Sequence, residues 1–132
     1  MLPNTLVKLE LDECSNLNKI EGLSGLAKLQ MLHIWQCKEV EELAGIETLV
    51  SLEQLWASGC VKLKSIRGLA PLTKLRSLDV SQCSELEELE NVEHCVSLKK
   101  LNAYGCPRLR NWEVVLQLRQ RLRERSAKVV LQ

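Results

Sequence analysis

The sequence lacks most of the features that would direct it to nucleic acid, to a membrane or to secretion. Its net charge is +1, which gives no reason to expect binding to polyanions. No apolar run approaches the ~20 residues of a membrane span. The chain does not open with a charged stretch followed by an apolar one, and it holds no Asn-x-Ser/Thr sequon, so we expect no signal peptide. With 45% apolar residues it reads as one folded domain over residues 1–132.

A repeat with a period of 23 residues runs along the chain. Its unit is L-x-x-L-x-L-x-x-C-x-x-L-x-x-I-x-x-L-x-x-L-x-x, and successive units start at residues 6, 29, 52, 75 and 98. A fixed period of this length predicts a stacked repeat array, and Leu-x-x-Leu-x-Leu-x-x-Cys is the signature of leucine-rich repeats. We therefore predict an α/β repeat fold, a leucine-rich-repeat solenoid of five 23-residue coils.

Each unit should contribute one strand and one return segment. Period-two alternation predicts parallel strands on the concave side of the solenoid, at Lys8–Leu11, Met31–Ile34, Gln54–Ala57, Ser77–Val80 and Lys100–Ala103. In the return segments, apolar residues recur at every third position, as at Leu17, Ile20 and Leu23. This spacing favours short 3₁₀ or irregular structure on the convex side over full α-helices.

The six cysteines are predicted to be free, buried thiols. Five occupy one column of the repeat, and Cys95 replaces the leucine of another. Side chains in a parallel ladder stay ~4.8 Å apart, too far for the ~3.8 Å between Cβ atoms that a disulfide needs. The thiols after the strands should face backbone amides of the neighbouring coil. Reduced cysteines indicate a reducing, cytoplasmic location, and the absence of any short Cys-x-x-Cys or Cys/His pairing argues against a metal site.

The two ends of the array are predicted to differ. At the C-terminus a cap over residues 112–132 begins with a helix from Trp112 to about Arg125, with Val115, Leu118 and Leu122 on one face. No cap precedes the first coil, whose Leu6, Leu9, Leu11, Leu17, Ile20 and Leu23 would lack cover on one side. We expect this edge either to fray or to join a second copy in an end-to-end homodimer.

The Cys form of the repeat resembles a known family. The stretch Leu-Asp-Val-Ser-Gln-Cys-Ser-Glu-Leu-Glu-Glu-Leu at 78–89, and Leu-Asn-Ala-Tyr-Gly-Cys-Pro-Arg-Leu at 101–109, are similar to the C-terminal repeats of plant intracellular nucleotide-binding, leucine-rich-repeat immune receptors. The resemblance covers residues 6–118. It implies a module that recognises pathogen molecules or guarded host proteins, or that helps to hold its receptor inactive. No G-x-x-x-x-G-K-[ST] motif of a nucleotide-binding segment is present.

A partner-binding surface is predicted on the strand residues that lie between the leucines. Three of the four aromatic residues fall there, and we expect Trp35 and Trp56 to form a diagonal cross-strand pair. Tryptophan clusters concentrate the energy of protein interfaces, although these rings could instead lie flat and shield the sheet. The candidate contact residues are Met31, His33, Trp35, Trp56, Asp79 and Tyr104.

Other functions find less support in the sequence. His33 and His94 are predicted on opposite faces, so no catalytic couple is expected, and we predict no enzyme and no cofactor. The basic residues Arg119, Arg121, Arg123, Arg125 and Lys128 lack interleaved aromatic residues and read as a solvated cap. Charges that alternate in sign from coil to coil on the convex side should mainly fix the register. Two alternatives to recognition stay open: a clamp that docks on another domain of the same receptor, and a free-standing scaffold of other descent.

Overall fold

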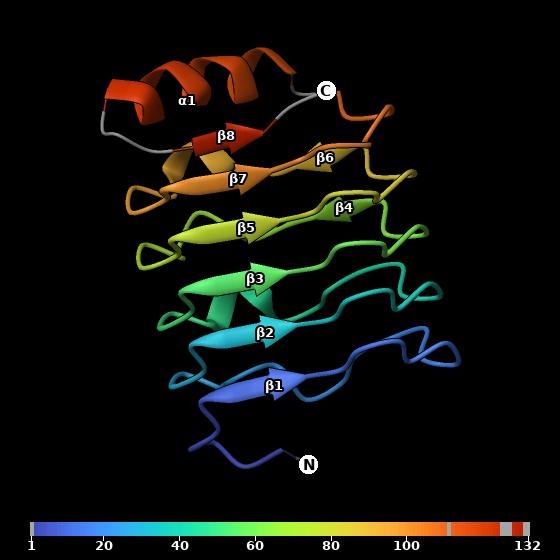
Figure 1. Cartoon of the computed structure of the whole chain (residues 1–132). Coiled ribbons are helices and arrows are strands. Elements are labelled where there is room, and N and C mark those ends of the chain that lie inside the picture. The colour runs from blue at the N-terminus through green and yellow to red at the C-terminus, as the bar shows by residue number, and fades with distance from the viewer. Residues whose placement is uncertain (1, 111, 125–127, 131–132) are drawn as a thin grey trace.

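The protein is a solenoid of parallel strands that ends in a helix. A computed structural model describes residues 2–110, 112–124 and 128–130. One sheet has the strand order β1 (Lys8–Glu10), β2 (Met31–His33), β3 (Gln54–Trp56), β5 (Ser77–Asp79), β7 (Lys100–Asn102) and β8 (Lys128–Val130), and every neighbouring pair is parallel. Figure 1 shows these strands stacked from the N-terminal to the C-terminal end. The parallel solenoid is thus confirmed, whereas the leucine-rich-repeat assignment and the count of five coils stay predictions.

The register of the sheet follows the 23-residue period. Leu9 pairs with Leu32, Leu32 with Leu55, and Leu55 with Leu78. Each of the five predicted strands is one residue shorter than expected at its C-terminal end. The residue after the strand still continues the ladder, since Leu11 N donates to His33 O at 2.8 Å and Ile34 N to Trp56 O at 2.8 Å.

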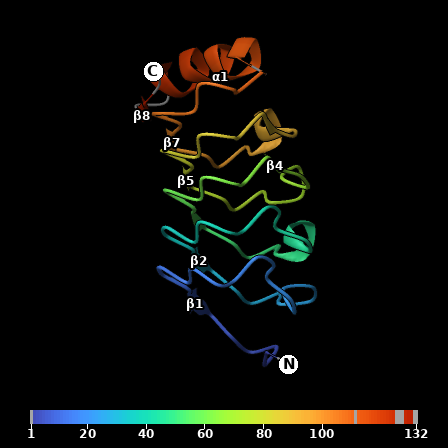
Figure 2. The same cartoon turned by 90° about the vertical axis from the view of Figure 1, so that its right-hand side faces the viewer.

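The return segments, which lead from one strand of the main sheet to the next, together form the return wall of the solenoid. The described part of this wall is mostly irregular, as predicted, and includes the short 3₁₀ segments η1 (Ile46–Thr48) and η2 (Val92–His94). A second sheet, which the sequence did not suggest, pairs β4 (Ser65–Ile66) with β6 (Glu88–Leu89). Figure 2, from the side, shows the return segments running back across the stack from the strand wall. The aliphatic columns between the two walls form one core, in which Leu32, Leu55 and Leu78 are fully buried.

The cysteines form a ladder of buried thiols, with one exception. Cys37, Cys60, Cys83, Cys95 and Cys106 are buried and all six are free, but Cys14 is only half-buried because no coil covers its outer side. The prediction of six fully buried thiols was therefore wrong at Cys14.

The thiols bond the neighbouring coil through its carbonyls as well as its amides. The Sγ atom of Cys60 donates to Ile34 O at 2.9 Å, and that of Cys83 to Ala57 O at 3.0 Å. A backbone hydrogen bond from Cys37 to the Cys60 thiol opposes the rise in pKa that burial causes. The prediction named only the amides. It missed the carbonyls, which accept because a thiol carries a proton to donate.

The C-terminal helix covers the last coil. Helix α1 (Trp112–Glu124) buries Val115, Leu118 and Leu122, the three residues predicted to face inward. Arg121 Nη1 donates to Glu93 O at 3.0 Å across to η2. After the helix, β8 adds to β7 with Leu101 opposite Val129, a strand that the sequence did not suggest. Arg125 and the side chains of Arg119, Arg123 and Lys128 lie outside the described residues.

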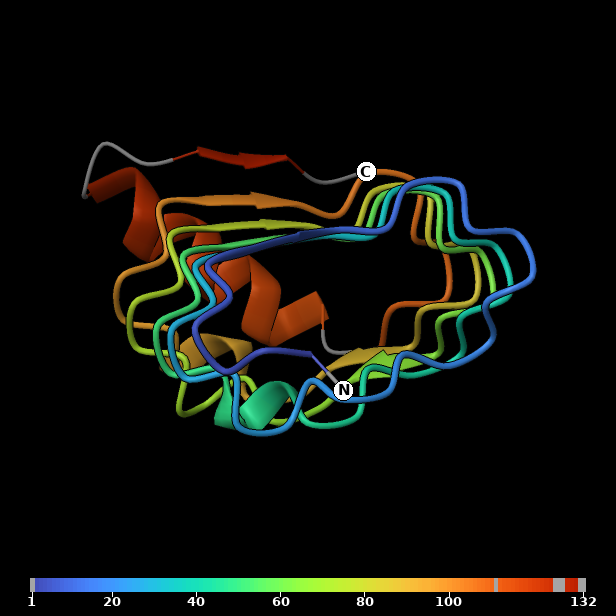
Figure 3. The ribbon, with the colours of Figure 1, turned by 90° about the horizontal axis from the view of Figure 1, so that it is seen from below.

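The N-terminal end is only partly covered. Leu6, Leu9, Leu11 and Leu17 are half-buried against the core. Ile20 and Leu23, which we expected to be uncovered as well, are 5% and 0% exposed. The N-terminal segment shields the return wall here, because the side chain of Leu2 lies against Gly22. Figure 3, seen from below, shows this segment crossing beneath the return wall and leaving β1 clear.

On the convex side, charged side chains of the described residues pair across neighbouring coils. Lys62 Nζ lies 3.0 Å from Glu39 Oε2, Arg108 Nη1 lies 3.8 Å from Glu85 Oε1, and Arg110 pairs with Glu87. Glu39 raises the pKa of the exposed Lys62 amine by accepting its hydrogen bond. Opposite charges thus meet across coils, as the alternating columns predict, and their role in fixing the register stays a prediction. Exposed pairs of this kind add little to stability.

Candidate binding surface

The strand face presents a column of polar and aromatic side chains in exact register with one another. Glu10 lies opposite His33, His33 opposite Trp56, and Trp56 opposite Asp79. Their neighbours along each strand are the leucines of the core. Because successive side chains of a strand point to opposite faces, the side chains of this column lie on the outer face of the sheet. The period of 23 thus builds a continuous outer surface from residues that are far apart in the sequence.

The centre of this surface is a stack of two rings. The imidazole of His33 and the indole of Trp56 lie with centroids 4.3 Å apart and planes 4° from parallel. The Trp56 Nε1 group donates to Ser77 Oγ at 3.1 Å, and His33 Nε2 lies 3.3 Å from Gln54 Oε1. These polar contacts fix both rings before any partner arrives. Trp56 nevertheless keeps 38% of its surface exposed.

The carboxylate of Glu10 borders the stack on its N-terminal side. Its Oε1 atom lies 3.9 Å from His33 Nδ1 and 2.8 Å from Lys8 Nζ. The hydrogen bond from Lys8, with the charge of that amine, lowers the pKa of Glu10. The ring stack is therefore flanked by a carboxylate that stays ionised near neutral pH.

Trp35 lies beside the stack but does not join it. It stands two residues beyond His33, in the turn after β2, and is 44% exposed. The next residue, Gln36, has φ +54°, and Trp35 O accepts from Glu13 N at 2.7 Å, so the turn fixes the backbone of Trp35. The expected Trp35–Trp56 pair is not what the structure shows, since Trp56 pairs with His33. A turn residue is not placed by strand alternation, which is why the cross-strand argument failed here.

Two of the other predicted contact residues have different surroundings. The carboxylate of Asp79 accepts hydrogen bonds from Ser81 N at 2.9 Å and from Ser81 Oγ at 2.7 Å. These bonds stabilise the turn that follows β5. Tyr104, 44% exposed, lies three strands away from Trp35 along the stack, about 14 Å at the usual strand spacing. Met31 is half-buried in β2. We define the aromatic cluster as His33, Trp35 and Trp56, with Met31 at its side.

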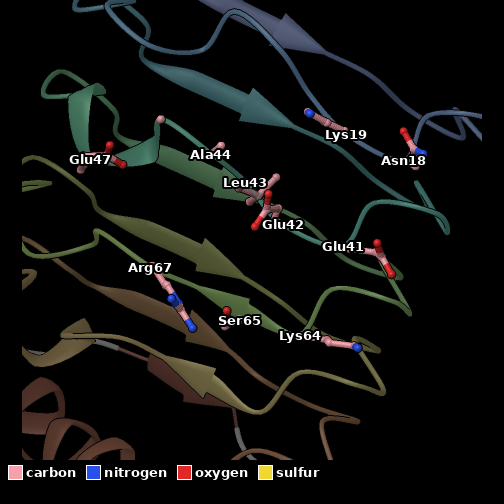
Figure 4. A pocket seen from close by; sticks show the side chains of 11 residues that line it. Asn18, Lys19, Glu41, Glu42, Leu43, Ala44, Glu47, Lys64, Ser65 and Arg67 are labelled. Atoms are coloured by element: carbon pink, nitrogen blue, oxygen red, sulfur yellow. The ribbon is translucent and has the colours of Figure 1, made fainter.

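A hollow of about 710 Å³ on the return wall was not anticipated from the sequence. Figure 4 shows its lining, in which Glu41, Glu42 and Glu47 lie between Lys19 of the preceding coil and Lys64 and Arg67 of the following one. These residues come from three successive coils, so only the repeat columns could have brought them together. Because acids and bases are balanced and the hollow is open, its charge selects no particular ligand.

The described residues contain no grouping of three or more His, Cys, Asp or Glu side chains placed to hold a metal ion. Over the same part of the chain, no helix has both the length and the apolar character to cross a membrane. His33 lies in β2, whereas His94 ends η2 on the return wall.

No protein-family model matches this sequence, and no curated protein matches it either.

Proposed function

We propose that this chain is a non-catalytic protein-recognition module of the leucine-rich-repeat type, similar to the C-terminal repeats of plant immune receptors. It binds a pathogen or host protein through the strand face, which the repeat pattern predicts to be concave. The observation that carries the proposal is the stack of Trp56 on the half-buried His33, with the exposed Trp35 beside it. The free thiols fit a reducing, cytoplasmic location.

Exposed, prepositioned rings favour binding over shielding. A tryptophan removes about 150–250 Å² from water when it is buried, so leaving two of them partly exposed carries a free-energy cost that a partner can recover. The rings are not part of the core, because Leu32 and Leu55, their neighbours along the strands, point to the opposite face of the sheet and are fully buried there. The hydrogen bonds to Ser77 and Gln54 also hold the rings in place, which lowers the entropy lost when a partner binds.

The shape of the surface indicates the class of partner. The cluster stands on an open sheet, and small ligands normally bind in enclosed sites. A protein surface that offers an apolar patch and a cation would meet the rings and the Glu10 carboxylate together. A folded protein or an extended peptide laid along the sheet therefore fits better than a small molecule.

The test selects binders from a randomised peptide library displayed on phage and compares three forms of the chain. The wild type serves as bait, a Trp35→Ala/Trp56→Ala variant removes the cluster, and Lys62→Glu is the matched control on the convex side. We expect enriched peptides to bind the control as tightly as the wild type. Against the double variant they should bind more than about 30-fold more weakly, the loss that interface hot spots show.

Thermal unfolding of the same variants separates binding from folding. Because both tryptophans are partly exposed, the double variant should melt close to the wild type. Selected peptides that bind equally well without the cluster would contradict the proposal. A large drop in melting temperature with unchanged peptide binding would assign the rings to stability instead.

A further inference from the structure

A second hollow lies where strands β3, β5 and β7 begin. It has a volume of about 490 Å³. Its lining includes three cations, one carboxylate and one exposed apolar side chain, which are Lys74, Arg76 and Lys99, then Glu53, then Val96. Three positive charges and one negative charge leave a net charge of +2, in contrast to the balanced hollow on the return wall.

The cations of this hollow depart from the alternation of charge seen on the convex side. Arg76 immediately precedes β5 and Lys99 immediately precedes β7, and Lys99 N donates to Arg76 O at 2.8 Å. Two like charges therefore stand in one column of neighbouring strands, which disfavours the pairing of those strands. Over the described residues, none of the three cations has a carboxylate within ion-pair distance, whereas Lys62 is paired with Glu39.

A carboxylate between Arg76 and Lys99 would relieve this repulsion. The guanidinium of an arginine presents a planar set of N–H donors that matches a carboxylate, and the ammonium of a lysine adds a positive charge. The apolar wall at Val96, which is 56% exposed, suits a short stem of methylene groups. A glutamate side chain supplies both the stem and the carboxylate.

The hollow and the aromatic cluster belong to one surface. Trp56 Nε1 donates to Ser77 Oγ at 3.1 Å, and Ser77 is the next residue after Arg76 in the sequence. The register of β3 on β5 places Arg76 one strand across and three residues back from Trp56. At the usual strand dimensions this separation is about 11 Å between Cα atoms, a distance that an extended peptide covers in about three or four residues.

We propose that this hollow takes a glutamate side chain of the protein that the aromatic cluster binds, about three or four residues from the apolar residue that rests on Trp56. This contact rests on the proposed function, since the same partner supplies both groups. It also gives the partner a direction. An apolar residue on the rings could be approached from any side, whereas a glutamate held at Arg76 fixes how a bound segment lies across the strands.

The first test repeats the selection from the peptide library with further baits. The wild type should enrich peptides that carry glutamate about three or four residues from an aromatic or large apolar residue. An Arg76→Gln/Lys99→Gln bait should lose that enrichment. Lys62→Gln/Arg108→Gln is the matched control, because it removes two positive charges on the convex side, and it should keep the enrichment.

A double-mutant cycle with one selected peptide then measures the contact. Replacing the glutamate of the peptide by glutamine should weaken binding to the wild type about 10-fold at low salt. The same replacement should leave binding to Arg76→Gln/Lys99→Gln unchanged, because the groups that hold the carboxylate are gone. Peptides that depend on Trp35 and Trp56 but show no preference for glutamate would overturn this contact and leave the proposed function standing.

The opposite result has a different meaning. Selected peptides that bind without the two tryptophans, or a wild-type bait that enriches no peptide, would overturn the proposed function and this contact with it. Inorganic phosphate that displaces the peptides from the wild type but not from Lys62→Gln/Arg108→Gln would act through bulk charge, and it would also count against the hollow.

Thermal unfolding without any peptide tests the repulsion itself. In low salt, Arg76→Gln/Lys99→Gln should melt about 1–3 °C above the wild type, because two like charges no longer stand side by side. The difference should vanish in high salt, which screens exposed charges. An unchanged or lower melting temperature of this variant in low salt would show that no repulsion awaits an anion, and it would overturn the proposal.

Discussion

The buried thiols should make this fold sensitive to alkaline pH. Burial raises the pKa of Cys60 to about 12 and that of Cys95 to about 11, and it raises the pKa of Cys83 further. In the unfolded chain the same thiols ionise near the ordinary value of 9.0. Above that pH the unfolded state binds fewer protons than the folded one, so the free energy of unfolding falls as pH rises. The contribution of the protonated thiols to the free energy of unfolding is fully present below about pH 8. It is lost as the pH rises from about 9 to 12.

The size of the effect follows from the count of thiols. At about pH 10, each thiol that ionises only in the unfolded chain lowers the free energy of unfolding by about 1.4 kcal/mol. Cys60, Cys83 and Cys95 together would remove about 4 kcal/mol, and the raised pKa values of Cys37 and Cys106 add to this in the same direction. A domain typically has ~5–15 kcal/mol in total. The protein should therefore lose a large share of its stability by about pH 10.

The assay is urea unfolding under reducing conditions from about pH 7 to about pH 10. Cys60→Ala should be less stable than the wild type near neutrality by about 1–2 kcal/mol, because it loses the hydrogen bond to Ile34 O and leaves a small void. That deficit should shrink by about 1.4 kcal/mol towards pH 10, since one ionising thiol is gone.

Val80→Ala is the matched control, because Val80 is equally buried and cannot ionise. Its deficit should stay constant across the same pH range. All three proteins share every other ionisable group, so the difference between Cys60→Ala and Val80→Ala reports on the Cys60 thiol alone. A Cys60→Ala deficit that does not change with pH would refute the reasoning, as would a wild type that is equally stable at both ends of the range.

The sequence predicted the strand register because the repeat constrains it redundantly. Each unit carries its own leucines and cysteine, so an error of one residue would turn Leu32, Leu55 and Leu78 outward together. The helix at Trp112–Glu124 could also be predicted from the sequence, because its apolar residues follow a helical period where the 23-residue columns end. Both predictions rest on patterns that extend over many residues.

The elements that were missed depend on contacts without such a pattern. Strand β8 follows the helix, where the 23-residue period no longer applies, so no column could indicate that Val129 would pair with Leu101. The two-residue strands β4 and β6 are too short to show alternation. The N-terminal segment, whose Leu2 lies against Gly22, stands outside the first repeat, so no column could indicate that Leu23 would be fully buried.

The candidate site was predicted at the level of columns but not of contacts. Register alone places His33 opposite Trp56, and this was available from the sequence. The stack itself does not follow from register, because register sets which side chains are neighbours and not how their rings are oriented. Local backbone geometry sets the turn at Gln36, with φ +54°, and the hydrogen bonds from Ser81 to the Asp79 carboxylate. A residue type such as glutamine or serine does not reveal this geometry.

Two further measurements test the packing between coils. Gly45→Ala and Gly25→Ala both place a side chain at positive φ, +92° and +86°, but only at Gly45 would the new Cβ meet a neighbour, Ser24 Oγ at 2.8 Å. Urea unfolding should therefore show Gly45→Ala to be the less stable by about 1–3 kcal/mol, and equal losses would contradict the packing described. Thiol labelling with a chromogenic disulfide tests the ladder: in dilute native protein only Cys14 should react rapidly, because Cys37, Cys60, Cys83, Cys95 and Cys106 are at most 1% exposed. Burial withholds these five from the reagent and also disfavours the reactive thiolate, so they should react at the rate of unfolding. Cys14→Ala should abolish the rapid phase, and a rapid phase that persists in this variant would show that the ladder is open elsewhere.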